Sequence, residues 1–118
     1  MQGGTYIAVF RLARRRRICV GRLGYLDFKP GVYFYVGSAQ RNLWARIERH
    51  SRKDKPLHWH IDCLSGAATM LGVMIVPRPH ERECELAVEL GRLYELPVPG
   101  FGASDCRCGG HLFYTPEL

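Results

Sequence analysis

The stretch GVYFYVGSAQRNLWARIERH, residues 31–50, decides how this chain is expected to fold. Its first part is rich in aromatic and β-branched residues and predicts a strand over 31–38, entered through the Pro30-Gly31 turn. Gly37 marks the end of that strand, and from about Asn42 the apolar residues recur at helical spacing. The stretch therefore predicts a strand that is followed directly by a helix.

The predicted strand and helix bring together residues suited to phosphate chemistry. Tyr33 and Tyr35 point to one face of the strand. Arg46 and His50 are four residues apart, so they project from the same side of the helix. A tyrosine hydroxyl can orient or deprotonate a water molecule, and an arginine can hold the charge of a phosphorane through bidentate contacts. The competing interpretation is a tyrosine-lined hairpin beside a basic, solvated helix.

Further strands and helices are predicted along the rest of the chain. The patterns predict strands over 4–12, 16–24 and 69–77, a short strand at 111–115, and helices over about 42–50, 56–68 and 78–96. Three early strands at close spacing suggest an antiparallel meander. We therefore expect a single α+β domain over residues 1–118, with a small antiparallel sheet (a three-strand meander plus one later strand) flanked by about three helices.

Composition is that of an ordinary globular domain. The chain has 118 residues, of which 47% are hydrophobic and 24% charged, and this length is enough to bury a core. No apolar run approaches the roughly 20 residues of a membrane-spanning helix. The N-terminus changes from neutral to basic, the reverse of a signal peptide. We therefore expect a cytoplasmic protein without membrane contact.

The formal net charge of +6 is unevenly distributed. One basic block is Arg14 to Arg17, and a second lies in and after the helix that carries Arg46. A polyanion would gain from both blocks through phosphate contacts and counterion release. The residues expected to bind nucleic acid are Arg41, Arg49, Arg52, Lys53 and Lys55. A solvated turn and a solvated helix face explain the composition equally well.

Two histidine-containing motifs are candidates for further sites. CRCGGH (106–111) supplies Cys106, Cys108 and His111 as zinc ligands, but Cys-x-Cys-x-x-His is not a standard finger spacing, and thiols packed beside a glycine turn are favoured over structural zinc. The odd number of cysteines, five, also argues against a disulfide framework.

HWHID (58–62) contributes His60 and Asp62 as candidates for a role near an active cleft. Trp44 and Trp59 are expected first as core residues, with base stacking as the less favoured interpretation.

The stretch YVGSAQRNLWARIERH (35–50) resembles the signature of the GIY-YIG nuclease superfamily, a strand ending in Tyr-Ile-Gly and a helix with the catalytic arginine. The residues at the positions of that signature are Tyr35, Val36, Gly37, Leu43, Arg46 and His50. The first triplet has two candidates, Gly4-Thr5-Tyr6 and Gly31-Val32-Tyr33. The first is preferred because it opens the first strand, whereas the second shares a strand with Tyr35 and leaves no room for a hairpin.

The resemblance extends over most of the chain. HWHID (58–62) and GFGASDCRCGGHLF (100–113) are similar to segments of a small, uncharacterised subfamily of stand-alone or fused GIY-YIG-like domains. The resemblance implies a metal-dependent endonuclease that hydrolyses phosphodiester bonds in DNA, or as a less favoured alternative RNA, in repair or in the processing of branched structures. A partner protein could supply specificity. A non-catalytic nucleic-acid-binding module with the same fold is the main alternative function.

The resemblance also implies roles for individual residues. Tyr6 would help to activate water with Tyr35 beside it, Arg46 would stabilise the transition state, and His50 would relay a proton or contact phosphate. One Mg²⁺ or Mn²⁺ ion would be held by a glutamate of the helix that contains ERECELAVEL. The first choice for that glutamate is Glu85, and the alternates are Glu83 and Glu89.

Overall fold

The computed structural model describes residues 3–57, 59–102 and 109–117. Within them the chain forms the strands β1 (Gly4–Leu12), β2 (Arg16–Cys19), β3 (Tyr25–Phe28), β4 (Gly31–Ala39), β5 (Thr69–Val76) and β6 (Leu112–Thr115). The α-helices are α1 (Leu43–Ser51), α2 (His60–Ser65) and α3 (Glu83–Gly91), and the 3₁₀ turns are η1 (Gly21–Leu23) and η2 (His80–Arg82). The predicted α+β class is therefore confirmed.

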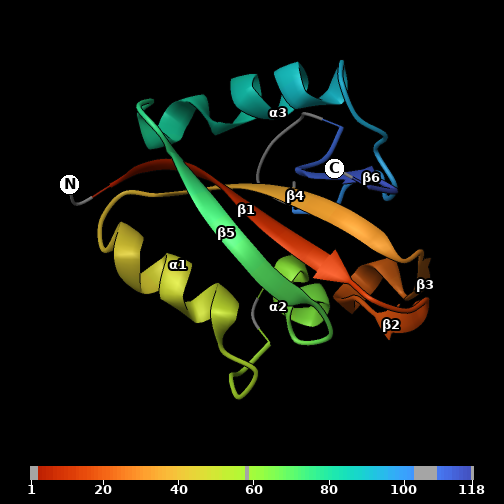
Figure 1. The fold of residues 1–118 in the computed structure, drawn as a ribbon. Helices are drawn as coiled ribbons and strands as arrows, with labels where there is room; N and C mark the ends of the chain where they lie inside the picture. Colours follow the sequence, from red (N-terminus) through yellow and green to blue (C-terminus); the bar gives the residue numbers. More distant parts are fainter. Residues whose placement is uncertain (1–2, 58, 103–108, 118) are drawn as a thin grey trace.

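The main sheet has four antiparallel strands in the order β5-β1-β4-β6. Its centre is the long pair β1 and β4, aligned from Gly4 opposite Ala39 to Leu12 opposite Gly31. Helix α3 covers one face of the sheet, and α1 and α2 lie on the other (Figure 1). The result is a three-layer arrangement, as expected when each face of a sheet must be covered by an apolar partner.

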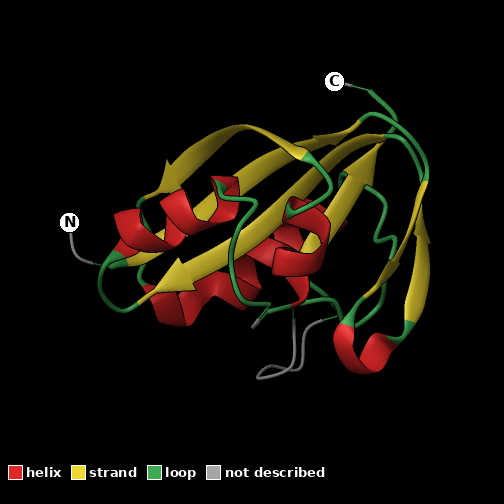
Figure 2. Ribbon diagram, turned by 90° about the horizontal axis from the view of Figure 1, so that it is seen from below, coloured by secondary structure: helices red, strands yellow, loops and turns green. Residues whose placement is uncertain are grey.

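The segment 16–24 differs from its predicted place in a three-strand meander. It is interrupted after β2 by two glycines with positive φ, Gly21 at 48° and Gly24 at 79°. These glycines allow the chain to turn back, so that β2 pairs with β3 in a separate two-stranded sheet. This small sheet projects from one end of the molecule (Figure 2), and β1 pairs directly with β4.

Strand alternation divides the core into two clusters. On the face toward α1 and α2, Tyr6, Phe10 and Tyr35 pack with residues of both helices. On the face toward α3, Phe34 and Phe113 pack with residues of that helix. The prediction that Tyr35 and Phe34 point to opposite faces is therefore confirmed, and both faces gain from burial, at about 25 cal/mol for each Å² of apolar surface.

Helix α1 is held by a narrow apolar stripe. Leu43, Ile47 and His50 are buried at the i, i+4 and i+7 positions, whereas Trp44 is 62% exposed. The prediction that Trp44 is a core residue is therefore wrong, because it lies off this stripe. The helix starts after Asn42, whose backbone is left-handed and whose side chain makes no cap hydrogen bond.

In the described part of the chain, every helix is too short or too polar to cross a membrane.

Gly37 is the position where a side chain is least tolerable in the sheet. It lies opposite Tyr6 in the β1–β4 pair, and a Cβ atom built on it would overlap the phenol ring of Tyr6. We expect Gly37→Ala to lower the free energy of unfolding by about 1–3 kcal/mol because the ring must shift. Urea titration measures this change.

Gly72→Ala is the matched control for Gly37→Ala. Gly72 lies on the edge strand β5, and a Cβ atom built there meets nothing within 4 Å. We expect this variant to stay within about 1 kcal/mol of the wild type. Equal destabilisation by the two substitutions would show that the loss comes from the backbone and not from the displaced tyrosine.

Candidate functional site

A cavity of about 440 Å³ brings together most of the residues predicted to be catalytic. Tyr6, Tyr35, Arg46 and His50 all line it, and Glu83 lines it where Glu85 was the first choice. The choice of Tyr6 over Tyr33 for the first triplet agrees with this placement, because Tyr33 is buried elsewhere and its hydroxyl donates to the Lys29 carbonyl.

The cavity lies beside the end of β4. Strand β6 pairs with β4 from Val32 to Tyr35, and the Val36 N–H donates to the His111 carbonyl at 2.9 Å. Within the described residues, no strand pairs with the rest of β4 on that side. Side chains from both faces of the sheet reach the same space there: Tyr35 from one face and Ser38 from the other. This is why residues of α1 and of the first turn of α3 meet at one cavity.

Tyr6 and His50 form a short, buried polar contact in the site. The Tyr6 hydroxyl lies 2.5 Å from His50 Nε2, and both residues are almost fully buried. Burial raises the pKa of Tyr6, with the neighbouring Tyr35 as the second cause. Burial of both side chains favours their neutral forms, and a hydrogen bond joins the phenol oxygen to the ring nitrogen.

The surroundings of His50 disfavour a positive charge. Its ring packs edge-on against Tyr35, at 5.7 Å between centroids, and against Phe10, at 6.3 Å. Burial lowers the pKa of His50 from 6.5 to about 4, and the ammonium of Lys55 acts in the same direction. Within the described residues, His50 Nδ1 is buried and has no hydrogen-bond partner, so Tyr6 makes the polar contact of this ring.

Arg46 projects into the cavity from α1 and is held at its rim. One guanidinium nitrogen, Nη1, donates to the Ser38 carbonyl, and the guanidinium carbon lies 4.4 Å from the centroid of the Trp59 ring. Trp59 lines the cavity and is 40% exposed. The prediction that Trp59 is a core residue is therefore wrong. Arg46 is placed by contacts on two sides and keeps other N–H groups for a ligand.

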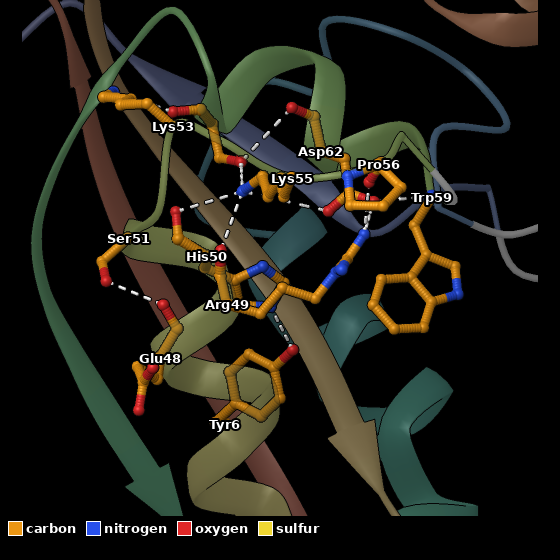
Figure 3. Close-up of polar contacts among 11 residues, drawn as sticks. Tyr6, Glu48, Arg49, His50, Ser51, Lys53, Lys55, Pro56, Trp59 and Asp62 are labelled. Atoms are coloured by element: carbon orange, nitrogen blue, oxygen red, sulfur yellow. Dashed lines mark hydrogen bonds and ion pairs between the residues drawn. The ribbon is translucent and has the colours of Figure 1, made fainter.

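A buried ion-pair network lies behind this rim (Figure 3). Asp62 is fully buried and accepts hydrogen bonds from Arg49 Nη2 at 2.8 Å and from the Trp59 backbone N–H at 3.0 Å. Lys55 Nζ lies 4.0 Å from Asp62, and its side chain is 1% exposed. Its ammonium donates to Ser65 Oγ at 2.6 Å. A carboxylate with several charged donors can remain ionised in the interior.

The structure changes the predicted roles of Lys55, Asp62 and His60. The structure removes Lys55 from the predicted nucleic-acid contacts, because its ammonium is buried against Asp62 and Ser65. Asp62 lies behind the cavity and positions Arg49 and Trp59. His60 is outside the cavity wall, where its Nδ1 accepts the Gly102 N–H at 2.9 Å.

The remaining predicted nucleic-acid contacts differ in their exposure. Arg41 and Arg52 are exposed, and Arg41 shares a shallow surface hollow with Arg46. Lys53 Nζ donates to the carbonyls of Ser65 and Ala68. Arg49 is mostly buried in its pair with Asp62. The basic surface near the cavity is therefore smaller than the sequence suggests.

Glu83 is the glutamate of α3 that reaches the cavity. Its Oε1 accepts from the Ser38 hydroxyl, and its Oε2 contacts Nδ1 of the buried His111. Glu85 and Glu89 lie away from this wall, in exposed ion pairs with Arg82 at 3.8 Å and Arg78 at 3.1 Å.

Residues two apart on a helix do not face the same side. Glu83 lines the cavity and Glu85 does not, so the alternate, Glu83, is the glutamate of α3 at this wall. Which glutamate binds a metal ion stays a prediction.

The predicted zinc ligands are only partly within the described residues. Cys106 and Cys108 lie outside them, and His111 is buried beside Glu83 and 3.6 Å from the Cys84 sulfur. Residues 3–57, 59–102 and 109–117 contain no group of three or more His, Cys, Asp or Glu side chains that could hold a metal ion.

Sequence patterns missed several of the residues that line the cavity, among them Ser38, Glu81 and Cys84. Strand alternation places Ser38 on the opposite face from Tyr35, so periodicity gave no reason to group them. Cys84 lies among apolar residues in the sequence, which predicts a core residue, yet it lines the cavity beside Glu83.

The low pKa of His50 predicts a pH-dependent loss of stability. As the pH falls through 6.5, the unfolded chain binds a proton at this histidine, whereas the folded chain does so only near pH 4. The free energy of unfolding should therefore decrease by about 2 kcal/mol between pH 7 and pH 5 from this group. Urea unfolding of the wild type and of His50→Gln measures it.

His50→Gln keeps every other titrating group, so the difference between the two proteins isolates the histidine. The variant should show a flatter dependence on pH over the same range. Parallel curves for the two proteins would contradict the placement of a neutral, buried His50.

Comparison with known proteins gives one family. A search of curated proteins and a search of solved structures returned no match to this chain. The family described as "Domain of unknown function DUF123" matches residues 5–118. This match contains all of the cavity described above and nearly the whole sequence. The chain therefore belongs to the DUF123 domain family.

Proposed function

We propose that this protein is a metal-dependent nuclease that hydrolyses phosphodiester bonds, with DNA as the favoured substrate. The observation that carries the proposal is the hydrogen-bonded Tyr6–His50 pair in the same cavity as the guanidinium of Arg46. A proton acceptor and a fixed cation are the two groups that water attack on a phosphodiester requires. The resemblance of 35–50 to the GIY-YIG signature supports the same chemistry.

In the proposed reaction, Tyr6 and His50 remove the proton from the attacking water. The water proton passes to the Tyr6 oxygen while the tyrosine proton passes to His50 Nε2, so neither step leaves a free tyrosinate. The pKa of about 4 makes His50 a weak base in the empty cavity. A bound phosphate brings negative charge nearby and raises that pKa, because an opposite charge stabilises the imidazolium.

Arg46 is proposed to bind the phosphate and to stabilise the charge that develops on it. Its guanidinium is held by the Ser38 carbonyl and packed beside Trp59, so little reorganisation is needed when the ligand arrives. Arginine forms bidentate contacts with phosphate oxygens, which a lysine at this position could not reproduce. The exposed Arg41 lies beside it and would contact the adjoining backbone.

Glu83 is the residue proposed to hold a divalent metal ion. Each oxygen of a carboxylate has two lone pairs, so the contacts with Ser38 and His111 leave acceptor capacity on both. One carboxylate suits Mg²⁺ or Mn²⁺, since such ions keep several water ligands and take others from the substrate phosphate. The ion, when bound, supplies Lewis-acid stabilisation of the leaving oxygen.

The first prediction concerns cleavage and Arg46. Labelled single-stranded, duplex, flap and branched DNAs should be cut in Mg²⁺ or Mn²⁺ and left intact in EDTA. Arg46→Ala should lower the rate by about 100-fold or more, as removal of a group that stabilises developing charge does. Arg92→Ala, which removes an exposed arginine outside the cavity lining and outside the predicted nucleic-acid contacts, should change the rate by only a small factor.

Two results would contradict the proposed nuclease activity. Binding of these DNAs without cleavage in any metal would favour the alternative, a non-catalytic nucleic-acid-binding module. Cleavage that persists at the wild-type rate in Arg46→Ala would assign the activity to a contaminant or to another site.

The second prediction separates the two glutamates of α3. Glu83→Gln should lower cleavage by about 100-fold, because it removes the carboxylate that lines the cavity, and part of the loss should be recovered at higher metal concentration. Glu85→Gln should retain activity, since its side chain is 61% exposed and pairs with Arg82. The opposite order of losses would restore the sequence-based choice of Glu85.

A further inference from the structure

Trp59 is the large aromatic side chain at the rim of the cavity. It is 40% exposed while lining the same cavity as Tyr6 and Arg46. The guanidinium carbons of Arg46 and Arg49 lie 4.4 and 5.0 Å from the centroid of its ring. An indole beside two guanidinium groups is a combination that stacks well with nucleobases, through the π-face and through cation–π attraction.

The position of the Trp59 ring is fixed by contacts with Asp62 and Arg49. The Trp59 backbone N–H donates to Asp62 Oδ2 at 3.0 Å, and Asp62 is fully buried. Arg49 binds the same carboxylate oxygen at 2.8 Å while its guanidinium lies over the ring. The indole is therefore held both through its backbone and through its ring. A ring held in place before binding loses little conformational entropy when a ligand stacks on it.

The ring is also close to the group that would hold phosphate. Arg46 contacts Trp59 directly, so a nucleotide whose phosphate binds Arg46 has its own base within reach of the indole. In a duplex that base is paired and stacked on its neighbours, and only its edges are open to the protein. A base presents a free face to an aromatic side chain only when it is unpaired or turned out of the stack.

We infer that Trp59, flanked by Arg46 and Arg49, is a stacking platform for an unpaired nucleobase next to the phosphate in the cavity. This inference rests on the proposed function for the position of the phosphate. It names the substrate class as nucleic acid with unpaired nucleotides: a single strand, a flap or a loop. Stacking tolerates any base, so the platform selects structure and not sequence.

The chain has two tryptophans, and this gives a direct optical test. Trp44→Phe leaves Trp59 as the sole indole, and Trp59→Phe leaves Trp44, which is 62% exposed on α1. Both proteins are titrated in EDTA, which prevents cleavage, with oligothymidylate and oligouridylate of about 12 nucleotides and with a duplex of the same length. Fluorescence anisotropy of a dye on each probe reports binding separately.

Stacking predicts that either single-stranded probe quenches the emission of Trp44→Phe, that the duplex does not, and that Trp59→Phe is not quenched. The two single strands distinguish DNA from RNA by their relative affinities. If a single strand binds without quenching Trp59, or if the duplex quenches it equally, the inference that Trp59 stacks with unpaired bases is wrong.

A pair of truncations measures the contribution of the ring to binding. Trp59→Leu should weaken single-strand binding by about 10-fold or more and duplex binding by less than about 2-fold. Trp44→Leu, the matched loss of an exposed tryptophan, should leave both affinities unchanged. Equal losses in the two variants would overturn the inference, and the quenching test decides it even if Trp59→Leu fails to fold.

The quenching experiments and the cleavage assays can reject the two proposals independently of each other. Quenching of Trp59 by single strands without any cleavage would reject the nuclease and keep the platform. Cleavage that depends on Arg46, with no quenching of Trp59, would keep the nuclease and reject the platform.

Discussion

The hydrogen bond between Tyr6 and His50 is the contact on which the arrangement of the site depends. It joins the first strand to the helix that follows the fourth, and it passes over Gly37, where only a hydrogen atom leaves room for the ring. Because both partners are buried, each favours its neutral form. The same burial that stabilises the domain therefore sets the proton chemistry available at the cavity.

Two carboxylates near that neutral pair, Asp62 and Glu83, each contact basic side chains. Behind the rim, Asp62 is compensated by Arg49 and Lys55, and at the opposite wall Glu83 meets His111. A buried carboxylate that lost its partners would cost several kcal/mol. Arg49 and Lys55 are therefore needed beside Asp62 in the interior. Beside the cavity, the positive groups at the surface are few, with Arg46 and Arg41 sharing one hollow, whereas the exposed block Arg14 to Arg17 is not part of the cavity lining.

Much of the fold could be predicted because local patterns and packing agree. Alternation placed Tyr35 and Phe34 on opposite faces, and helical spacing placed Arg46 and His50 on one side of α1. The small sheet of β2 and β3 was missed because two glycines with positive φ redirect the chain, which a strand-forming composition conceals. Trp44 and Trp59 were misplaced for a different reason: hydrophobicity predicts burial on average and does not tell which face a residue occupies.

The sequence by itself determined the α+β class, the strand followed directly by a helix, and the pairing of tyrosine, arginine and histidine at one corner. These follow from periods of 2 and 3.6 residues, which act over short distances along the chain. The predicted end of that strand at Gly37 is wrong, because β4 continues to Ala39. Only the tertiary structure decided that Glu83 and not Glu85 lines the cavity, that Lys55 and Asp62 lie behind it, and that Trp59 lies at its rim. Such choices depend on where β6 stops and how α3 is rotated, and they are set by packing between segments far apart in the sequence.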